Sequence, residues 1–584
     1  MRIEPMANHR RASWHRDACR LTFSILAICS ANAWSQAPEA FRPNAGTILN
    51  IYAPPVEMPE LPTVALPRIA DEIPGDDTAG AKFKLTRFVL EGVTLLPQSE
   101  VEAQLAGLVG RDVSLGDLRK AAAGITNLYR DKGYFLARAY VPAQEISGGV
   151  VRMAVLEGRY DRVAAKGSPR LDSERVQKIL APSGVPPGGP VERARLERSL
   201  ILLEQQAGAP AQALLQPGAT IGTSYMEIDT PSGPLFSGLL GADNYGAYYT
   251  GQARATASLA LNSPLGIGDR GSVWLAHSTG ADAIFASYQI PVGYDGLTLG
   301  ASASYYTYQL CCQFATLDRA GDAAVFGIQA RYPLLLSQRS LMFAGLSLER
   351  KRLTDTWVGG DLDDKRLNVA SLSLDGITIA LAGQTRYRLA LTGGDLDLKG
   401  PADYVKVNAA TIDTAGRYAK LWGQVEFQQP LARWSFLTLR LSGQSASRNL
   451  DSSEKFLLGG FNGVRAYPEG EAAGDNAWLA RLDWVVPVTS AALPGKAAVR
   501  AFVDSGALWV VDNTRGGLAD PGIPNHYSLS GAGLGLNWVL PKGFSLSAYA
   551  AAKIGDNPGR SASGNDADGK DSKVRGWVGA DWSF

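Results

Sequence analysis

The sequence is poor in the residues that usually carry catalysis or metal binding. Among its 584 residues it has only four cysteines and four histidines. Two histidines lie in the basic N-terminal region and two stand alone further on: His9, His15, His277 and His526. No spacing typical of a zinc site or of a Ser/His/Asp arrangement is present. The sequence therefore indicates no catalytic residue, no metal site and no cofactor, and it does not predict an enzyme.

An excess of one charge and long hydrophobic runs are also lacking. Lys and Arg number 57 against 56 Asp and Glu, which gives a net charge of +1. Nucleic-acid binding would call for a basic face, so the balance gives no reason to expect it. No apolar run reaches the roughly 18 residues that a transmembrane helix needs. A membrane role would therefore require a β-barrel.

The N-terminus has the pattern of an export signal. An apolar stretch over 21–30 precedes the small-x-small sequence Ala31-Asn32-Ala33. The basic region in front of it contains Arg10, Arg11, Arg16 and Arg20. We therefore predict that residues 1–33 form a signal peptide, with Met6 as an alternative start.

Only two cysteines would remain after removal of that peptide. Cys311 and Cys312 are adjacent, so they predict no disulfide framework. They can form a vicinal bridge or stay reduced in an exposed loop. We favour a loop feature without a catalytic role.

Residues 34–82 are rich in proline. Repeated proline blocks regular secondary structure and favours an extended, semi-rigid chain. We therefore predict a linker over this range. The sequence leaves open whether part of it docks on or inside the following barrel.

Two regions after the linker combine strands and helices in the same order. In residues 83–159, a strand that begins at Phe83 ends before Gly92, and the apolar residues of 115–132 share one helical face. Two further strands follow in a hairpin-like pair. The order strand, helix, helix, strand, strand recurs over 160–235. The sequence therefore predicts two α+β modules of about 75 residues each.

From residue 236 to residue 584 the helical period gives way to alternation of apolar and polar residues. In the last strand Val574 and Val578 share one face with Trp582, whereas Arg575 and Asp581 lie on the other. Lipid cannot hydrogen-bond to the backbone, so a spanning sheet must close on itself, apolar outside and polar inside. A soluble β-sandwich also alternates, but long strands with charged residues in their middle favour a membrane barrel. We predict a transmembrane antiparallel β-barrel of about 16 strands.

The start of the predicted barrel carries a dense motif. It consists of Asp243, Asn244, Gly246, Thr250, Gly251 and Arg254, then Asn262 to Gly266 and Gly268-Asp269. These residues resemble the D-N-x-G, T-G-x-x-R and N-P-L-G-x-G-D motifs of TpsB-type transporters of two-partner secretion, with Ser263 inserted before the proline. The first module is similar to the family's polypeptide-transport-associated (POTRA) pattern at Tyr129, Gly133-Tyr134, Pro142-Ala143-Gln144 and Glu157-Gly158. The last strand, ending in Trp582 and Phe584, resembles the signal that the barrel assembly machinery reads.

Two further motifs carry the resemblance. Val464, Arg465, Ala466 and Tyr467 are similar to the V-R-G-Y tip of a long family loop that folds back into the barrel, with alanine where glycine is usual. Phe502, Asp504 and Gly506 are similar to the F-x-D-x-G strand that faces this tip. An unpaired charge in a lumen is costly, so we expect Arg465 to pair with Asp504 and anchor the loop, rather than to be a solvated loop arginine. Any glycine-only backbone conformation at Ala466 is in question.

The resemblance implies an outer-membrane pore with its POTRA modules in the periplasm. Its partner would be a secreted TpsA-like protein, captured unfolded by strand addition and moved to the cell surface. The alternative is an assembly factor for other outer-membrane proteins, although such relatives usually carry more POTRA modules. The cargo cannot be derived from the sequence; an adhesin, a haemolysin and a contact toxin all remain open.

Overall fold

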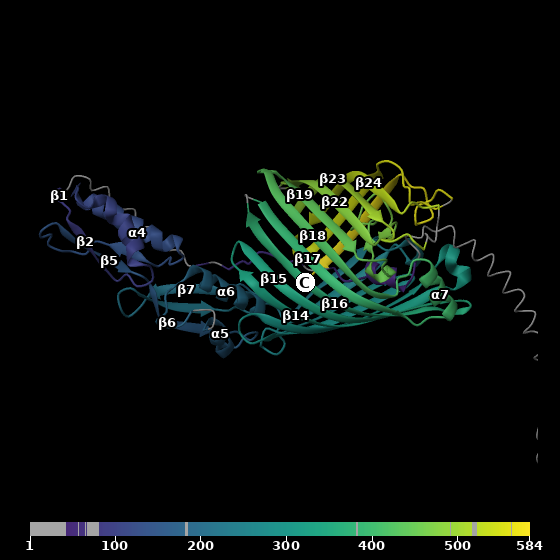
Figure 1. Cartoon of the computed structure of the whole chain (residues 1–584), viewed down its shortest axis with the longest axis horizontal. Coiled ribbons are helices and arrows are strands. Elements are labelled where there is room, and N and C mark those ends of the chain that lie inside the picture. The colour runs from purple at the N-terminus through teal and green to yellow at the C-terminus, as the bar shows by residue number, and fades with distance from the viewer. Residues whose placement is uncertain are drawn as a thin grey trace, which may run out of the picture.

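The computed structural model describes residues 43–55, 58–64, 66, 81–181, 185–380, 383–490, 492–516, 522–561 and 563–584. The predicted signal peptide lies outside these residues. Figure 1 shows an elongated molecule in which two α+β modules lie in a row beside one end of a large barrel. Within the described residues, no helix has both the length and the apolar character needed to cross a membrane.

The first module contains two small sheets and two α-helices. β2 lies parallel to β5, and β4 pairs with the other edge of β5. β1 pairs with β3 instead, so the single strand expected before Gly92 is divided between two sheets. The elements are β1 (Phe83–Lys84), β2 (Arg87–Glu91), α3 (Gln98–Leu105), β3 (Asp112–Val113), α4 (Leu115–Asp131), β4 (Arg138–Tyr140) and β5 (Val150–Leu156).

Helix α4 is the most regular part of this module. The Ser114 hydroxyl accepts a hydrogen bond from the Asp117 N–H, and the Asp117 carboxylate accepts one from the Ser114 N–H; this capping box begins the helix. The helix buries Leu118, Ile125 and Tyr129, which confirms the predicted apolar face.

The second module is one sheet covered by two helices. β8 lies between β6 and β7, parallel to the first and antiparallel to the second. Its elements are β6 (Arg159–Lys166), α5 (Ser173–Leu180), α6 (Arg193–Ala207), β7 (Gln212–Pro217) and β8 (Thr223–Asp229). The strand–helix–helix–strand–strand order expected from the sequence is therefore present.

The barrel is closed and antiparallel, and it consists of sixteen strands, as predicted. Consecutive strands pair with each other, and β26 returns to β9. The strands are β9 (Phe236–Asp243), β10 (Arg254–Asn262), β11 (Arg270–Ser278), β12 (Ala281–Val292), β13 (Leu297–Gln309), β14 (Ala320–Leu336), β15 (Ser340–Trp357), β16 (Gly360–Ala380), β17 (Gly383–Leu398), β18 (Gly416–Ala432), β19 (Ser435–Ala446), β22 (Asn476–Val488), β23 (Lys496–Trp509), β24 (His526–Val539), β25 (Phe544–Lys553) and β26 (Val574–Ser583).

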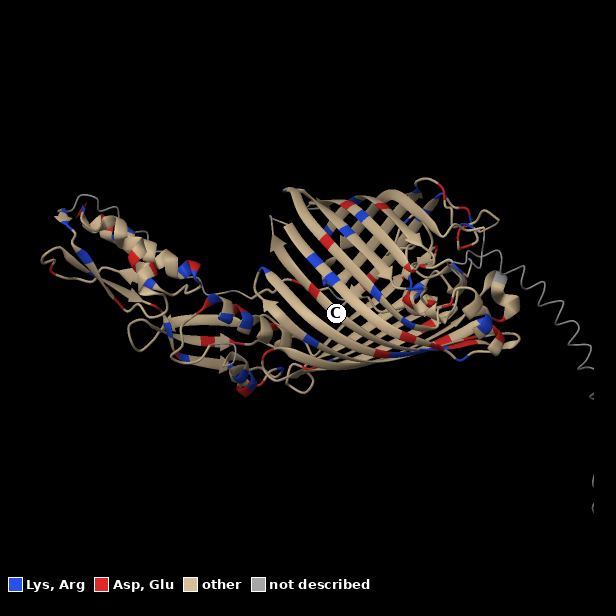
Figure 2. Ribbon diagram, viewed as in Figure 1, with Lys and Arg blue, Asp and Glu red and all other residues tan. Residues whose placement is uncertain are grey.

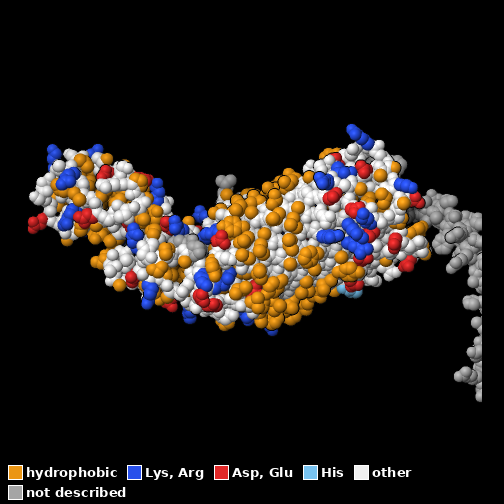
Figure 3. Space-filling view, turned by 60° about the horizontal axis from the view of Figure 1, so that its bottom comes forward, with side chains coloured by type: hydrophobic (Ala, Val, Ile, Leu, Met, Phe, Trp, Pro, Cys, Tyr) orange, Lys and Arg blue, Asp and Glu red, His pale blue; other side chains and the backbone are white. Residues whose placement is uncertain are grey.

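The two faces of the barrel wall differ as a membrane requires. Phe326, Leu348 and Leu372 are exposed on the outside, whereas their strands bury Lys351 and Lys365 in the lumen. Figure 3 shows the resulting apolar belt, and Figure 2 shows charged residues distributed along the strands. The belt faces hydrocarbon, and the paired charges stay inside.

The second module is attached to the barrel end where β9 begins. Ser263, the residue inserted into the family motif, accepts a hydrogen bond from the Gly268 N–H and donates to the Arg170 carbonyl at 2.6 Å. Arg198 donates to the carbonyl of Asp295 in another turn at this end. These contacts fix the module against the periplasmic turns.

Two segments differ from a simple barrel. The prolines predicted an extended linker, but Ala45–Ile51 forms helix α2, because a proline-free stretch follows Pro43 and Asn44 caps it in a capping box. The region between β19 and β22 folds inward through the pair β20 (Phe456–Leu457) and β21 (Ala473–Gly474). Residues 458–472 between them are called the lumen loop below.

The adjacent cysteines lie between β13 and β14. A disulfide joins Cys311 and Cys312, both of which are exposed. The Cys311 N–H donates to the carbonyl of Tyr249, so the bridge lies beside the barrel-entrance motif. Of the two states left open by the sequence, the structure has the bridge.

Candidate functional site

The lumen loop is held by one buried arginine. Arg465 is 2% exposed, and its guanidinium donates to Asp504 at 2.6 and 2.8 Å and to Asp483 at 2.9 and 3.3 Å. The Arg465 N–H also donates to Asp504. The structure therefore brings the two predicted residues together and adds Asp483, which the sequence analysis did not select. Its only signal is its place on the inward face of β22 beside Arg481, which does not distinguish it from other inward carboxylates.

Aromatic side chains enclose this ion pair. The Arg465 guanidinium carbon lies 3.6 Å from the ring centre of Phe502, and Trp577 donates to the Arg465 carbonyl at 2.7 Å. Phe461 of the same loop stacks on Tyr245 with ring centres 3.9 Å apart. A guanidinium that is both fully paired and stacked on rings is strongly localised. The loop tip is thus attached to β22, β23 and β26 together.

Ala466 is accommodated by a space in the opposite wall. Its φ is not positive, so no glycine-only conformation is needed there. Its methyl group faces Gly531 of β24, where an added Cβ would overlap it. Along β24, a Cβ at Gly533 would meet the ring of Phe502 at 2.5 Å. The alternating glycines of β24 therefore leave room for the loop tip and its anchor.

Helix α2 occupies the lumen beside this loop and packs in an apolar cluster with inward residues of the barrel, including Tyr306, Leu353 and Leu367. At its N-terminus the Ala45 N–H donates to Asp355 at 2.7 Å. A carboxylate there is favoured because the first N–H groups of a helix lack partners within it.

Contacts to the lumen wall and its loops fix the two ends of α2. Ser452 donates to Asn44 at 2.8 Å, and Asn50 donates to the Ser452 carbonyl. At the other end the Tyr52 hydroxyl lies 2.8 Å from Ser278 Oγ and 3.2 Å from Thr250 Oγ1. Most of these hydrogen bonds are between neutral groups, whereas the lumen loop is anchored by charge-assisted ones.

The barrel-entrance motif connects α2 with the barrel wall. Arg254 forms a two-point ion pair with Asp243 at 2.9 and 3.1 Å, and its guanidinium carbon lies 5.8 Å from the ring centres of both Tyr52 and Tyr245. Gly251 has φ of +101°, which favours glycine. A Cβ at Gly246 would overlap the carbonyl oxygen of Gly251. The motif thus forms a tight turn that orients Arg254 into the lumen.

Asn244 of the same motif lengthens the seam between β26 and β9, where the barrel closes. The ladder between β26 and β9 runs only from Gly579 opposite Asp243 to Ser583 opposite Leu239. Asn244 extends it, because its side chain donates to the Gly576 carbonyl and accepts from the Val578 N–H.

The C-terminal residues lie at the other end of this seam. Phe584 exchanges backbone hydrogen bonds with Gly238, and Trp582 donates to the Lys542 carbonyl at 3.1 Å. Both rings are exposed on the outer face. The residues proposed as an assembly signal are therefore accessible at the periplasmic end.

In the first module the Glu157-Gly158 pair fixes a turn. Glu157 accepts from the backbone of Thr94 and Leu95, from the Thr94 hydroxyl and from Tyr129. Burial raises the pKa of the Glu157 carboxyl, but these hydrogen bonds outweigh it and hold the pKa below its usual range. At Gly158, an added Cβ would lie 2.5 Å from that of Leu136. The motif is thus explained by the structure of the module.

Comparison with known proteins agrees with this architecture. Residues 222–538 match the family model described as haemolysin secretion/activation protein ShlB/FhaC/HecB, and residues 83–158 match the ShlB-type POTRA domain. The chain is 26% identical over 491 residues to the heme/hemopexin transporter protein HuxB of Haemophilus influenzae, covering 82% of this chain and 85% of the relative. It is 24% identical to the outer membrane transporter CdiB of Dickeya dadantii, covering 74% and 77%.

Solved structures share the fold. CdiB from Escherichia coli superposes with a TM-score of 0.68 at 20% identity, covering 99% of this chain and 100% of that one. CdiB from Acinetobacter baumannii gives 0.62 at 17% identity, covering 97% and 98%. With more than half of its length matched by the family model, the chain belongs to the ShlB/FhaC/HecB family, the TpsB transporters of two-partner secretion, which are outer-membrane transport proteins and not enzymes.

Proposed function

We propose that this transporter captures an unfolded partner at its POTRA modules and exports it through the lumen after α2 has left. The observation that carries the proposal is the difference between the two lumen occupants. The lumen loop is anchored by a buried arginine with two carboxylates, whereas α2 is held by apolar packing and by mainly neutral hydrogen bonds. Export then removes the occupant without an ion-pair anchor and retains the other.

The modules provide edges for strand addition. β2 and β7 are edge strands of their sheets, and Leu214 on β7 is 56% exposed. An extended client can pair its backbone with such an edge while its side chains fit beside a helix. In contrast, Gln144 covers part of β5, because its side chain exchanges two hydrogen bonds with the backbone of Arg152. β4 and β6 are edge strands as well, and the exposed Leu214 makes β7 the edge that we propose for capture.

The proposal also covers how the barrel is assembled and which lipid surrounds it. The exposed rings of Trp582 and Phe584 at the end of β26 would be recognised by the barrel assembly machinery, and the apolar belt would contact outer-membrane lipid. The alternative, an assembly factor for other barrels, draws on a related fold: BamA from Haemophilus ducreyi superposes with a TM-score of 0.50 at 14% identity. The family match favours export.

The export proposal is tested by secretion of a candidate partner encoded beside this chain. The two proteins are co-expressed, and the partner is measured in the medium. We expect secretion only when the transporter is present. Equal amounts in the medium without it would contradict export. A general loss of other outer-membrane proteins in a deletion strain would instead support the assembly role.

The displacement of α2 is tested by a disulfide. The side chains of Asn44 and Ser452 are hydrogen-bonded at 2.8 Å, so Asn44→Cys/Ser452→Cys places two sulfurs within bonding reach. We expect the oxidised double variant to insert normally and to secrete nothing, and reductant to restore secretion. The single-cysteine variants and the wild type under the same reductant are the controls. Secretion by the fully cross-linked protein would contradict the proposal.

A further inference from the structure

The outer wall carries arginines where the apolar belt ends. Arg350 and Arg352 of β15 are exposed and alternate with Lys351 and Leu353, which lie in the lumen. Two further outward arginines lie on β16 and β18, namely Arg366 and Arg417. These four residues are called the arginine patch. Figure 3 shows Lys and Arg side chains gathered beside the belt, at the end of the barrel farther from the modules, with acidic side chains among them.

The strand register brings like charges together. Arg352 lies directly opposite Arg366 on neighbouring strands. Like charges at such positions destabilise a sheet unless an anion lies between them. The two guanidinium groups share one carboxylate oxygen of Asp364, at 3.4 Å each. This distance is long for a charge-assisted hydrogen bond, so the pair is only partly neutralised.

Part of the hydrogen-bonding capacity of the patch is not used by ion pairs among the residues that the structure describes. Among the described residues, no carboxylate lies within 4.0 Å of Arg350 or Arg417, and Nε of Arg366 has no hydrogen-bond partner. Asp395 and Asp397 of β17 lie within the patch, directly opposite Arg417 and Arg366 respectively. They offset the charge on that side, so the part of the patch left for an anion is the β15 side at Arg350.

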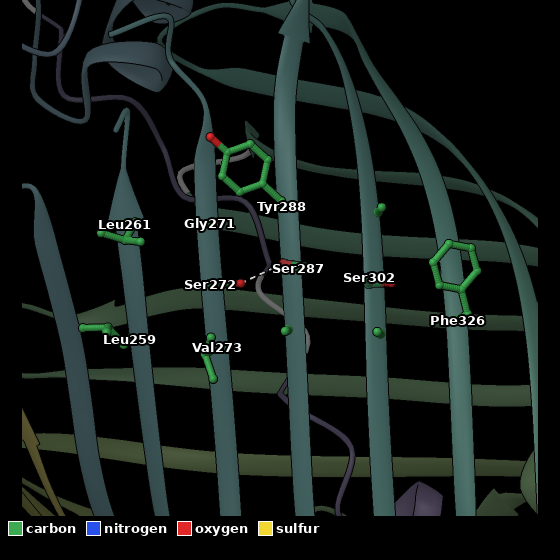
Figure 4. Close-up of a pocket in the computed structure, with 12 residues that line it drawn as sticks. Leu259, Leu261, Gly271, Ser272, Val273, Ser287, Tyr288, Ser302 and Phe326 are labelled. Carbon is green, nitrogen blue, oxygen red and sulfur yellow. Dashed lines mark hydrogen bonds between the residues drawn. The ribbon is translucent and has the colours of Figure 1, made fainter. Parts of the chain in front are cut away.

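An apolar groove begins next to the patch. Phe326 of β14 lies directly opposite Arg350 and also lines a groove across β10 to β14. Figure 4 shows this groove between bulky side chains, with Leu259 on one side and Phe326 on the other. Its floor is made of small residues, including Gly271, Ala286, Ala301 and Ala303. A flexible acyl chain can fill a concave apolar surface in the hydrocarbon layer. The wall of a second copy of the barrel has the same concavity there and would leave the groove unfilled.

We infer that the arginine patch and the groove together bind a phosphorylated, acylated lipid of the outer leaflet. The guanidinium groups contact its phosphates, because their planar donors match phosphate oxygens at two points. One acyl chain passes Phe326 into the groove. The arginine patch matches the phosphorylated headgroup of the lipid, and the groove matches its acyl chain. The site lies on the outer wall, separate from the lumen through which the client is proposed to pass.

The test measures lipid binding to the purified full-length protein in detergent. The probes are bisphosphorylated lipid A, the same lipid without phosphates, and inorganic phosphate. The variant Arg350→Gln/Arg417→Gln removes the two arginines without carboxylate partners. The control Arg433→Gln/Lys496→Gln removes the same charge from exposed residues at the periplasmic turns. Heat-modifiable migration in gels verifies that each barrel is folded.

We expect the patch variant to bind bisphosphorylated lipid A about tenfold more weakly or worse, and the control to bind it like the wild type. Dephosphorylated lipid should bind weakly to every variant, and inorganic phosphate should not compete at equal concentration. Unchanged affinity in the patch variant would overturn the inference. Equal losses in both variants, or full competition by phosphate alone, would do so as well. Ala303→Phe, which fills the groove, should weaken the binding of lipid A while the barrel stays folded.

Discussion

At the scale of single residues, the guanidinium of Arg465 is the anchor of the lumen loop. Arg465→Lys keeps the charge but loses the two-point contacts with Asp504 and Asp483, so we expect about 3 kcal/mol less anchoring. Partner secretion should fall while heat-modifiable migration stays normal. The matched control is Arg440→Lys, which changes another lumenal arginine paired with Glu426. Normal secretion by Arg465→Lys would contradict the proposed role of Arg465 as an anchor.

Gly531 and Ala466 form a second testable contact. Gly531→Ala places its Cβ against that of Ala466, and we expect a loss of about 1–3 kcal/mol in barrel stability. Ala466→Gly in the same chain should restore most of it. Gly393→Ala is the control, because the nearest atom to an added Cβ there lies 4.0 Å away. Thermal unfolding followed in gels measures all four proteins. A double variant no more stable than Gly531→Ala would contradict the contact.

Glu157 predicts a pH dependence in the first module. Its pKa is below the usual range in the folded state, so its stabilisation is complete above the unfolded value of about 4.3. It is lost as the pH falls through the lower folded value. Hydrogen exchange at the amides of Thr94 and Leu95 measures this directly. We expect their protection to weaken in that acidic range, and Glu157→Gln to weaken it at neutral pH. Acid-independent protection would contradict the prediction.

The sequence was informative about some of these residues and silent about others. It selected Arg465 and Asp504 because the motifs are specific and a lumenal charge needs a partner. Asp483 was missed, because one inward carboxylate among many on alternating strands has no distinguishing spacing. Gly531 has no signal in the sequence, since its role depends on a loop 65 residues away in the chain that returns to face it.

At the scale of elements, the strands were predictable and the lumen occupants were not. Alternation locates β19 and β26 because each side of the wall meets a different solvent. Helix α2 is short and apolar, and it lies in a proline-rich range, so no periodic pattern reveals it. Its stability comes from the barrel interior, since a helix of seven residues is not stable alone.

Removing α2 should therefore open the pore. We expect a deletion of residues 43–55 to raise the conductance of single channels in planar bilayers. The helix packs against inward residues of the barrel, so its removal leaves more open space for ions in the lumen. The oxidised Asn44→Cys/Ser452→Cys variant, which retains α2, should conduct like the wild type. Equal conductance of the deletion and the wild type would show that another segment closes the lumen.

At the scale of the whole molecule, the segment after α2 connects the lumen with the second module. Thr63 donates through its N–H and its hydroxyl to Glu204 of α6, and Gln338 donates to the Val64 carbonyl. Val64 is buried in the apolar cluster of this module, next to barrel residues at the same end. The chain therefore runs from the lumen to the POTRA side and is fastened there.

This fastening makes α2 a tethered plug. Ten residues lie between Tyr52 and Thr63, a reach of at most about 40 Å, so the freed helix would stay near the barrel mouth. A short tether of this kind keeps the local concentration of its end in the millimolar range. Re-closing is then a first-order event, independent of how many transporters the membrane holds. On the proposed export route, each pore would reset itself once its cargo has passed.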